Sequence, residues 1–193
     1  MPPAVESKRL FIASSLSEEI KHSLSTIIEE LKKSGSDTKW IERENIHLTI
    51  KFLGNTPIEK IKNISEVLSK TFSEESAPCV TLEKLGSFPS LSEPRVIWAG
   101  LKDASGFLKR APAALEAALE KIGFEKETRG FQAHITLGRM RSPLNKINLI
   151  EKMNTANANF HEKTFCIDNI TLFESCLTPK GPVYTIFHQV KLK

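Results

Sequence analysis

The sequence predicts an α+β fold in a single domain that spans residues 1–193. Stretches with the two-residue alternation of strands interleave with stretches that have the 3.6-residue period of helices. Several predicted strands are joined by short turns, which favours an antiparallel or mixed sheet over a doubly wound parallel sheet. Hydrophobic residues make up 40% of the chain and charged residues 26%, so a core can be buried, and no linker-like stretch divides the sequence.

The chain begins with a predicted strand and a predicted helix. The apolar run RLFIAS at residues 9–14 is typical of a buried strand. Ser15 and Glu18 then form a predicted capping box, with Ser15 as the N-cap of the helix. The apolar face of this helix consists of Ile20, Leu24, Ile27, Ile28 and Leu31. Residues 34–38 form a predicted loop after the helix ends.

A second strand and helix follow the same order. Residues 46–53 alternate between apolar and polar side chains and predict a strand. Pro57 at the first position and Glu59 as a capping acid predict the start of the next helix. Its apolar stripe consists of Ile58, Ile61, Ile64, Val67, Leu68 and Phe72.

The remainder of the chain continues this mixture. The other predicted elements are strands at 78–88, 94–100 and 131–140, helices at 104–122 and 142–153, and strands at 163–174 and 183–192. Pro112 lies inside the pattern of the helix at 104–122, where it either kinks the helix or marks its start.

Composition excludes several classes of protein. Nine Gly and ten Pro are too few for a collagenous or low-complexity chain. No apolar run reaches the ~18–20 residues of a membrane span, and the first residues lack the order of a secretory signal. The net charge of +4 is spread along the chain, so a polyanion is tolerated as a partner without being indicated.

The cysteines add a prediction about the compartment. Cys79, Cys166 and Cys176 are odd in number and have no C-x-x-C spacing, which predicts neither a disulfide framework nor a zinc ribbon. We therefore expect a globular protein of a reducing compartment, cytoplasmic, without a membrane partner, and monomeric.

One four-residue pattern, His-apolar-Thr-apolar, occurs twice in the sequence. It covers residues 47–50 (HLTI) and residues 134–137 (HITL), each within a predicted strand. Chance alone predicts roughly 0.05 copies of this pattern, and two copies have odds on the order of one in a thousand. The repetition therefore indicates a shared function.

The spacing of the pattern places two functional groups on one face of a strand. Residues i and i+2 point the same way, about 6–7 Å apart, so His47 projects with Thr49 and His134 with Thr136. Two such strands facing each other would surround a small anion with two imidazoles and two hydroxyls. That set suits metal-free acid–base catalysis at a phosphodiester, in which one histidine takes a proton from water and the other gives a proton to the leaving oxygen.

Other interpretations of these residues remain open. Each motif alone is more typical of an amphipathic strand whose histidine faces solvent, and it is the repetition that favours a functional role. A metal site would need a second His, Cys or acid at ligand spacing, which neither motif has, so no metal or cofactor is predicted. Arg139, at the end of the second motif strand, either reaches a phosphate or is an exposed structural arginine. Lys51 is predicted on the face of His47, where a solvated side chain is the simpler interpretation, and His22, His161 and His188 receive no role.

At these residues the sequence resembles the 2H phosphoesterase superfamily, which is named for its two H-x-[ST]-x motifs. It is most similar to the RNA 2′,3′-cyclic phosphodiesterases, also called 2′-5′ RNA ligases. The segments that carry the resemblance, in the order of the family, are RLFIAS, WIERENIHLTIKFLG, GSFPS, PRVIWAG, HITLGR and LFESCLTPKGPVY. They extend over nearly the whole chain.

The resemblance implies a bilobed fold of two pseudo-symmetric halves, each with an antiparallel sheet and flanking helices around a central cleft. It implies that His47 is the proton donor, that His134 is the proton acceptor, and that Thr49 and Thr136 hold the phosphate. The implied reaction opens an RNA-terminal 2′,3′-cyclic phosphate to a 2′-phosphomonoester without a metal, with weak joining of RNA ends in some members. Tyr184 matches a family position but receives no role.

Two alternative functions remain at this stage. The same site would serve a cyclic phosphodiesterase that acts on small nucleotides or on 2′-5′ oligonucleotides, since only the rim of the cleft would differ. A module that binds RNA without turnover would be a different class of protein. Both motifs are intact, which weighs against that class, because loss of either histidine would be its simplest signature.

Overall fold

The computed structural model describes residues 6–128, 130–179 and 181–193, and it confirms the α+β prediction. The helices are α1 Glu18–Lys32, α2 Lys60–Phe72, α3 Phe107–Glu120 and α4 Lys146–Ala158, with a short 3-10 helix, η1, at Arg43–Asn45. The strands are β1 Ser7–Ser15, β2 Thr38–Trp40, β3 His47–Pro57, β4 Cys79–Pro89, β5 Pro94–Lys102, β6 His134–Met140, β7 Lys163–Cys166, β8 Asn169–Thr178 and β9 Gly181–Lys191.

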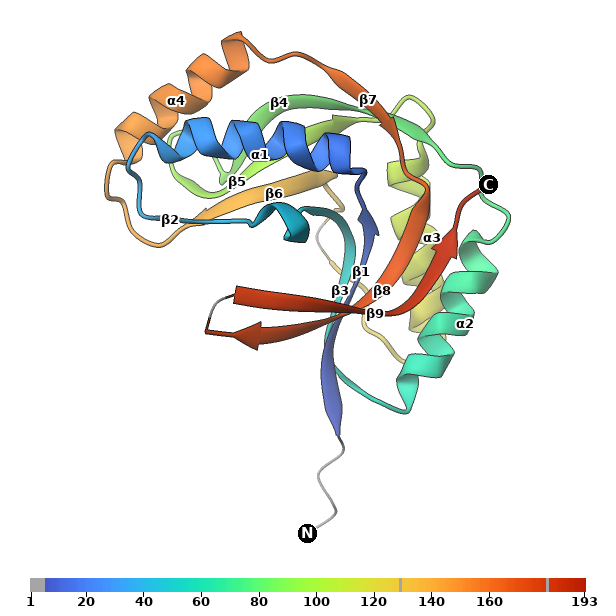
Figure 1. Ribbon diagram of the computed structural model, residues 1–193. Coiled ribbons are helices and arrows are strands. Elements are labelled where there is room, and N and C mark those ends of the chain that lie inside the picture. Colours follow the sequence, from blue (N-terminus) through green and yellow to red (C-terminus); the bar gives the residue numbers. More distant parts are fainter. Residues whose placement is uncertain (1–5, 129, 180) are drawn as a thin grey trace.

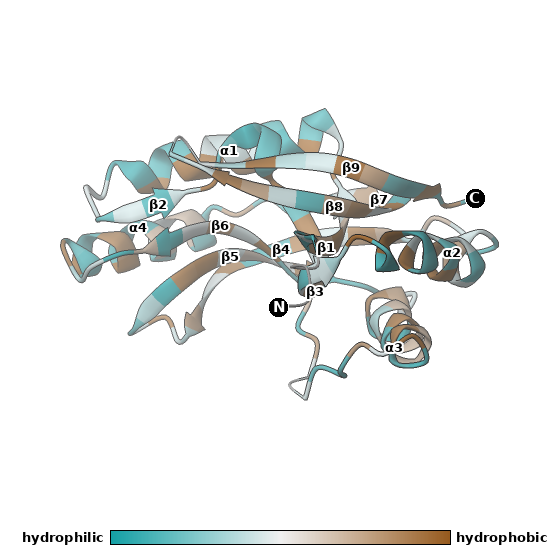
Figure 2. Ribbon diagram, turned by 90° about the horizontal axis from the view of Figure 1, so that it is seen from below, coloured by the Kyte–Doolittle hydropathy of each residue, from teal (hydrophilic) through white to brown (hydrophobic). Residues whose placement is uncertain are grey.

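The strands form two antiparallel sheets. Sheet A has the order β3-β1-β8-β9, and sheet B has the order β2-β6-β5-β4-β7. Helices α1 and α4 lie at one end of the molecule with sheet B, whereas α2 and α3 lie at the other end with sheet A (Figures 1 and 2). One cluster of buried apolar side chains joins the helices to one face of both sheets. We call the opposite faces of the two sheets the histidine faces, because both motif histidines lie there.

The helix starts differ from their predicted positions. Helix α1 is capped by Ser17, whose Oγ accepts a hydrogen bond from the N–H of Ile20, whereas the predicted cap Ser15 belongs to β1. Helix α2 begins three residues after Pro57, because β3 continues through that residue. Helix α4 begins after Asn145, which has a left-handed φ of 52°, and so it starts later than residue 142. At α1 and α2, strand pairing therefore overrode the local capping pattern.

Two further differences arise where the chain passes between sheets. The predicted strand at 163–174 is two strands, since β7 pairs in sheet B and β8 pairs in sheet A. The predicted loop at 34–38 ends in the short strand β2, which pairs with β6. Pro112 lies inside α3 and does not mark its start.

The cysteine prediction was wrong for two of the three residues. Cys79 in β4 and Cys166 in β7 are directly opposed in the antiparallel ladder and form a disulfide. The pairing follows from the register of two strands far apart in the sequence, so cysteine spacing gives no sign of it. Disulfides persist mainly in oxidising compartments, so the cytoplasmic location stays a prediction that this bond does not support. No helix within the described ranges is long and apolar enough to cross a membrane.

A β-bulge in β3 decides where Lys51 points. Ile12 of β1 faces Lys51 and Ala13 faces Thr49, so Ile50 has no partner of its own and the alternation shifts by one residue. Lys51 therefore lies on the core side, where its Nζ pairs with Oε1 of Glu116 in α3 at 2.6 Å and its side chain is only 9% exposed. The prediction that Lys51 shares the face of His47 was wrong.

The Lys51–Glu116 pair yields a stability prediction. Glu116→Gln leaves a nearly buried ammonium without its carboxylate, and we expect the free energy of unfolding to fall by about 2–4 kcal/mol. Urea denaturation measures the change. The control is Glu120→Gln, one turn along α3, which breaks an exposed pair with Lys126 and should cost less than about 1 kcal/mol. Equal losses in the two variants would contradict the burial argument.

Candidate active site

The two motif histidines occupy equivalent positions in the two sheets. His47 is the first residue of β3 and His134 is the first residue of β6. Both side chains are half-buried, whereas the adjacent Leu48 and Ile135 are fully buried in the common core. The apolar motif positions thus anchor each strand, as predicted, and the histidines lie on the opposite faces.

Each imidazole is fixed by the backbone in the same way. Nδ1 of His47 lies 2.7 Å from the carbonyl oxygen of Asn45, and Nδ1 of His134 lies 2.7 Å from that of Gln132. A carbonyl oxygen can only accept, so Nδ1 donates the hydrogen bond in both residues. Nε2 of each ring is therefore the nitrogen that remains for a substrate.

The two threonines share the faces of the histidines. Thr49 is paired with Ala13 of β1, and Thr136 is paired with Trp98 of β5, both on the histidine faces. Each lies two residues after its histidine, which corresponds to about 6–7 Å along the strand. Within each sheet, a hydroxyl thus accompanies an imidazole.

A bulge in β6 brings Arg139 to the same face. Ile97 faces Gly138 and Trp98 faces Thr136, so Leu137 has no partner and the alternation shifts. Simple alternation would place Gly138 on the face of His134, but Gly138 lies on the core side, where a Cβ would be 2.7 Å from the Trp40 ring. Arg139 takes the place on the histidine face that simple alternation would give to Gly138.

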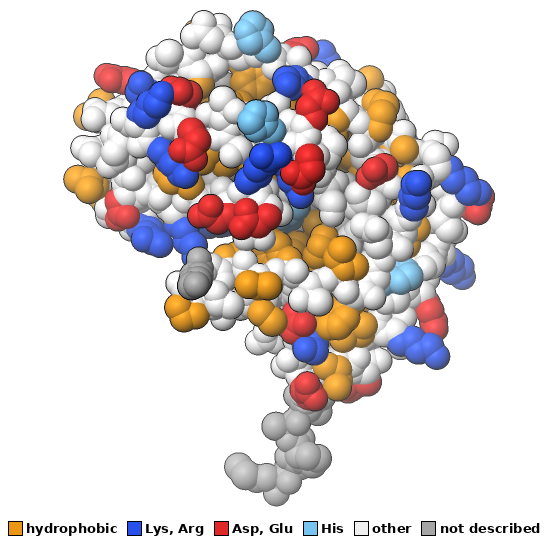
Figure 3. All heavy atoms as spheres, viewed as in Figure 1, with side chains coloured by type: hydrophobic (Ala, Val, Ile, Leu, Met, Phe, Trp, Pro, Cys, Tyr) orange, Lys and Arg blue, Asp and Glu red, His pale blue; other side chains and the backbone are white. Residues whose placement is uncertain are grey.

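The strand β2 holds the two motif strands near each other. Trp40 of β2 pairs with Gly138, and the N–H of Ile41 donates to the carbonyl of Leu137 at 2.9 Å. The chain then passes through η1 directly into His47. β3 and β6 are consequently in contact although they belong to different sheets. Figure 3 shows a recess between the two lobes, with apolar side chains along its lower side.

The charge of Arg139 acts on both motif histidines. Burial is the main cause that lowers the pKa of His47 and of His134 below the usual value, partly opposed by the backbone hydrogen bonds. The positive charge of Arg139 lowers both pKa values further. One guanidinium therefore acts on both imidazoles, and the neutral form of each ring is favoured.

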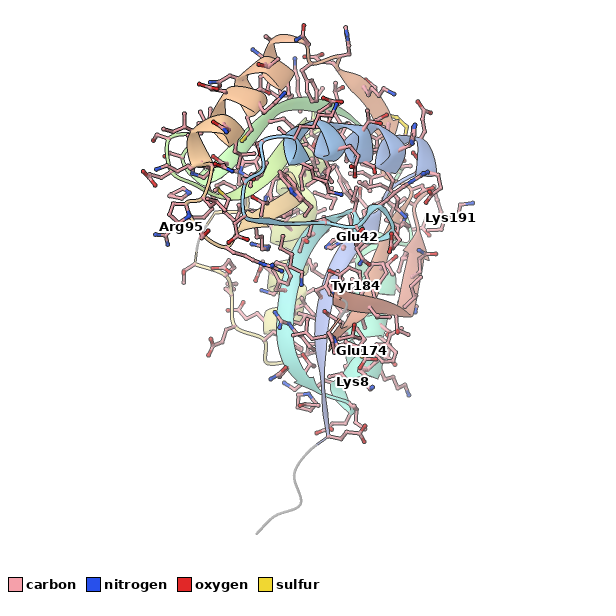
Figure 4. All side chains as sticks on the ribbon, turned by 60° about the vertical axis from the view of Figure 1, so that its left-hand side comes forward. Lys8, Glu42, Arg95, Glu174, Tyr184 and Lys191 are labelled. Carbon is pink, nitrogen blue, oxygen red and sulfur yellow. A yellow bond between two sulfur atoms is a disulfide. The ribbon has the colours of Figure 1, made fainter. Side chains whose placement is uncertain are left out.

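Aromatic rings surround each histidine. The His47 ring lies 5.0 Å from Phe11 and meets Tyr184 edge-on at 5.4 Å, whereas the His134 ring meets Phe88 edge-on at 5.0 Å. Figure 4 shows Tyr184 on the β8–β9 hairpin, with Lys8 and Glu174 below it. Burial raises the pKa of Tyr184, and the charges of Arg139 and Arg9 oppose this rise.

Sequence reasoning missed Asn45 as a positioning residue. Its carbonyl holds His47, and its Nδ2 donates to the carbonyl of Pro182 at 3.1 Å in the β8–β9 hairpin. This contact ties the hairpin that carries Tyr184 to the segment before His47. The two residues are far apart in the sequence, and no local pattern relates them.

His188 lies on the face of sheet A opposite to His47. Nε2 of His188 is hydrogen-bonded to Ser69 of α2 on the core side of sheet A. Within residues 6–128, 130–179 and 181–193, no group of three or more His, Cys, Asp or Glu side chains is arranged to hold a metal ion.

Comparisons with known proteins identify the family of the chain. The family model "LigT like Phosphoesterase" matches residues 15–98 and 102–184, and one His-x-Thr motif lies in each segment. Two curated relatives are named RNA 2′,3′-cyclic phosphodiesterase. The one from Archaeoglobus fulgidus is 34% identical over 91% of this chain and 96% of its own length, and the one from Thermotoga maritima is 33% identical over 96% of each.

Solved structures share the fold. The protein TT0787 of Thermus thermophilus superposes with a TM-score of 0.79 at 26% identity, over 95% of this chain and 97% of that one. E. coli LigT complexed with 3′-AMP superposes with a TM-score of 0.75 at 24% identity, over 97% of this chain and 99% of that one. The two-lobed arrangement of antiparallel sheets, the paired motifs and the match over both halves have one explanation: the chain belongs to the LigT-like phosphoesterase family.

Proposed function

We propose that this protein hydrolyses RNA-terminal 2′,3′-cyclic phosphates to 2′-phosphomonoesters by paired-histidine acid–base catalysis, without a metal. The observation that carries the proposal is the equivalence of His47 and His134, each anchored through Nδ1 and each within the field of Arg139. The names of curated relatives that cover nearly the whole chain support the substrate class.

The displacement needs one base and one acid on opposite sides of phosphorus. Nε2 of His134 takes a proton from a water molecule as its oxygen bonds to phosphorus. The bond from phosphorus to O3′ breaks, and Nε2 of His47 gives its proton to O3′, so the phosphate stays on O2′. Exchange with solvent then returns His47 to the protonated and His134 to the neutral form.

The neighbouring groups stabilise the charge that develops in the reaction. The hydroxyls of Thr49 and Thr136 donate hydrogen bonds to the non-bridging oxygens, and the guanidinium of Arg139 binds the same anion. An RNA 5′-hydroxyl in place of water would form a 2′-5′ linkage by the same displacement. We propose such joining as a weak side reaction.

The electrostatics suit an anionic substrate. In the free protein, burial and Arg139 favour neutral rings. A bound phosphate brings a negative charge next to both imidazoles, which raises the pKa of each and favours one imidazolium. The substrate itself therefore helps to create the protonated acid that its leaving oxygen needs.

Replacement of either histidine tests the roles. His47→Ala and His134→Ala should each lower kcat on an RNA oligonucleotide with a 2′,3′-cyclic phosphate end by about 10²-fold or more. Phosphorus NMR of the wild-type product should show a 2′-phosphate. The exposed His22→Ala is the control and should keep wild-type turnover. Wild-type rates in both active-site variants, with circular dichroism unchanged, would refute the proposal.

Metal removal tests the proposed chemistry separately. Excess EDTA followed by dialysis should leave the turnover of the cyclic-phosphate oligonucleotide unchanged, since acid, base and anion-binding groups all come from the chain. The measurement is kcat/KM before and after treatment, with zinc or magnesium added back. A loss of activity that one of these ions restores would contradict the metal-free mechanism.

The shared guanidinium predicts a pH effect. Arg139→Met removes a positive charge near both imidazoles, so the pKa of each should rise and both limbs of the pH profile of kcat/KM should move to higher pH. The control is Arg141→Met, which removes the same charge just beyond β6 and should leave the limbs in place. A lower rate with unmoved limbs would show that Arg139 does not act on the histidines.

A further inference from the structure

The histidine face of sheet A carries an exposed aromatic ring beyond the catalytic pair. The bulge at Ile50 that turns Lys51 to the core side places Phe52 opposite Phe11, on the histidine face. The Phe52 ring lies 6.2 Å from the Phe11 ring and is 64% exposed, whereas Phe11 is buried. A row of rings therefore runs from His47 through Phe11 to Phe52, and its far end is open to solvent.

Arg9 lies on the same face, at the next step along β1. It alternates with Phe11 and Ala13, whose side chains form the small cluster on this face. Arg9 is exposed, and within the described part of the chain its guanidinium has no hydrogen bond or ion pair. Its charge acts on Tyr184, where it opposes the rise that burial causes in the pKa. The adjacent Lys8 points to the other face and pairs with Glu174 at 2.9 Å.

Arg9 lies further along β1 from His47 than Phe11 does. The His47 and Phe11 rings are 5.0 Å apart. Arg9 lies a further two residues along β1, about 6–7 Å. Arg9 thus lies beyond Phe11, outward along β1 from the imidazole that the reacting group must touch. A free arginine at that position suits a second phosphate of the same substrate, since bidentate binding of phosphate is the typical use of an exposed guanidinium.

The chemistry fixes the side on which the RNA extends. His47 protonates O3′ in the proposed mechanism, and O3′ belongs to the ribose of the terminal nucleotide. The nucleoside and the RNA upstream of it therefore lie on the side of His47 and sheet A, whereas the water lies on the side of His134. Figure 4 shows this region, with Tyr184 and Lys8 labelled on sheet A and Arg95 far across the molecule.

We propose that Arg9 binds the backbone phosphate upstream of the terminal nucleotide and that Phe52 stacks with an upstream base. The subsite would make an oligonucleotide end, rather than a cyclic mononucleotide, the preferred substrate. Aromatic side chains stack with any base, so length is recognised without sequence. The inference rests on the proposed function, because it extends the same site.

The test compares substrates of different length. We would measure kcat/KM on cytidine 2′,3′-cyclic phosphate and on di- and trinucleotides that end in the same group. The wild type should prefer the longer substrates, and Arg9→Ala should reduce the ratio of long to short by about tenfold. Phe52→Ala should also reduce this ratio, because the ring that stacks with the upstream base is lost, whereas Phe52→Tyr keeps a ring and should retain the ratio. The matched control is Lys8→Ala, which removes the same charge from the opposite face of the same strand.

Salt dependence gives a second readout. One additional phosphate contact with single-stranded RNA should steepen the dependence of log kcat/KM on log salt by about 0.7 for the oligonucleotide relative to the mononucleotide. This difference should disappear in Arg9→Ala and persist in Lys8→Ala.

The outcomes separate the two proposals. Equal kcat/KM of the wild type on all lengths, or the same length ratio in Arg9→Ala as in the wild type, would overturn the subsite while the phosphodiesterase proposal stands. An equal loss in Lys8→Ala would also overturn it, since net charge alone would explain the effect. Failure of the wild type on every cyclic-phosphate substrate would refute the proposed function itself.

Discussion

The pairing of β2 with β6 is the constraint on which the geometry of the site depends. The two motif strands belong to different sheets, and within each sheet nothing fixes the position of one histidine relative to the other. β2 is only three residues long, yet it is hydrogen-bonded to β6 and the chain continues from it into β3. The bond from Ile41 to Leu137 therefore sets the start of β3 against the middle of β6. Buried side chains of β3 and β6 also pack in the same apolar core, which stabilises the position of one strand relative to the other.

The bulges in β3 and β6 place different side chains beside the two copies of the His-x-Thr motif. In both strands the alternation shifts after the Thr-apolar pair, so the residue five positions after the histidine joins the histidine face. That residue is Phe52 in one half and Arg139 in the other. An arginine suits the anion at the centre of the reaction, and an exposed ring suits a base at its periphery. The duplicated motif thus supplies the same imidazole and hydroxyl to each half, and the position after each bulge distinguishes the halves.

Much of the fold could be predicted because strand and helix periodicity is local. The placement of the histidines and threonines opposite the core follows from residues two apart in one strand, and the family follows from segments spread over nearly the whole chain. The errors share a different cause. Lys51 and Gly138 point to unexpected faces because a bulge depends on the partner strand, and Cys79 meets Cys166 because two distant strands are in register. Ser15 has the sequence of a cap but remains in β1, where its N–H donates to Asn169. In each case the structure depends on pairing with a strand that is distant in the sequence, which the local pattern does not contain.

The division of roles between the histidines requires a further argument, because their direct surroundings are nearly equal. Both rings donate from Nδ1 to a carbonyl, both are partly buried, and both lie within the field of the same arginine. Electrostatics alone therefore does not select the acid. The asymmetry comes from what lies beyond each ring. On the side of His47, sheet A extends through Phe11 to an open ring and a free guanidinium, which offers room and contacts for a nucleoside. On the side of His134, the neighbouring rings are Phe88 at 5.0 Å and Trp98 at 6.3 Å, and Trp98 lies over Gly86, where a Cβ would collide with the indole ring. The exposed ring of Phe52 and the guanidinium of Arg9, which suit a nucleotide, therefore lie on the side of His47, and this placement agrees with the proposal that His47 is the acid and His134 the base.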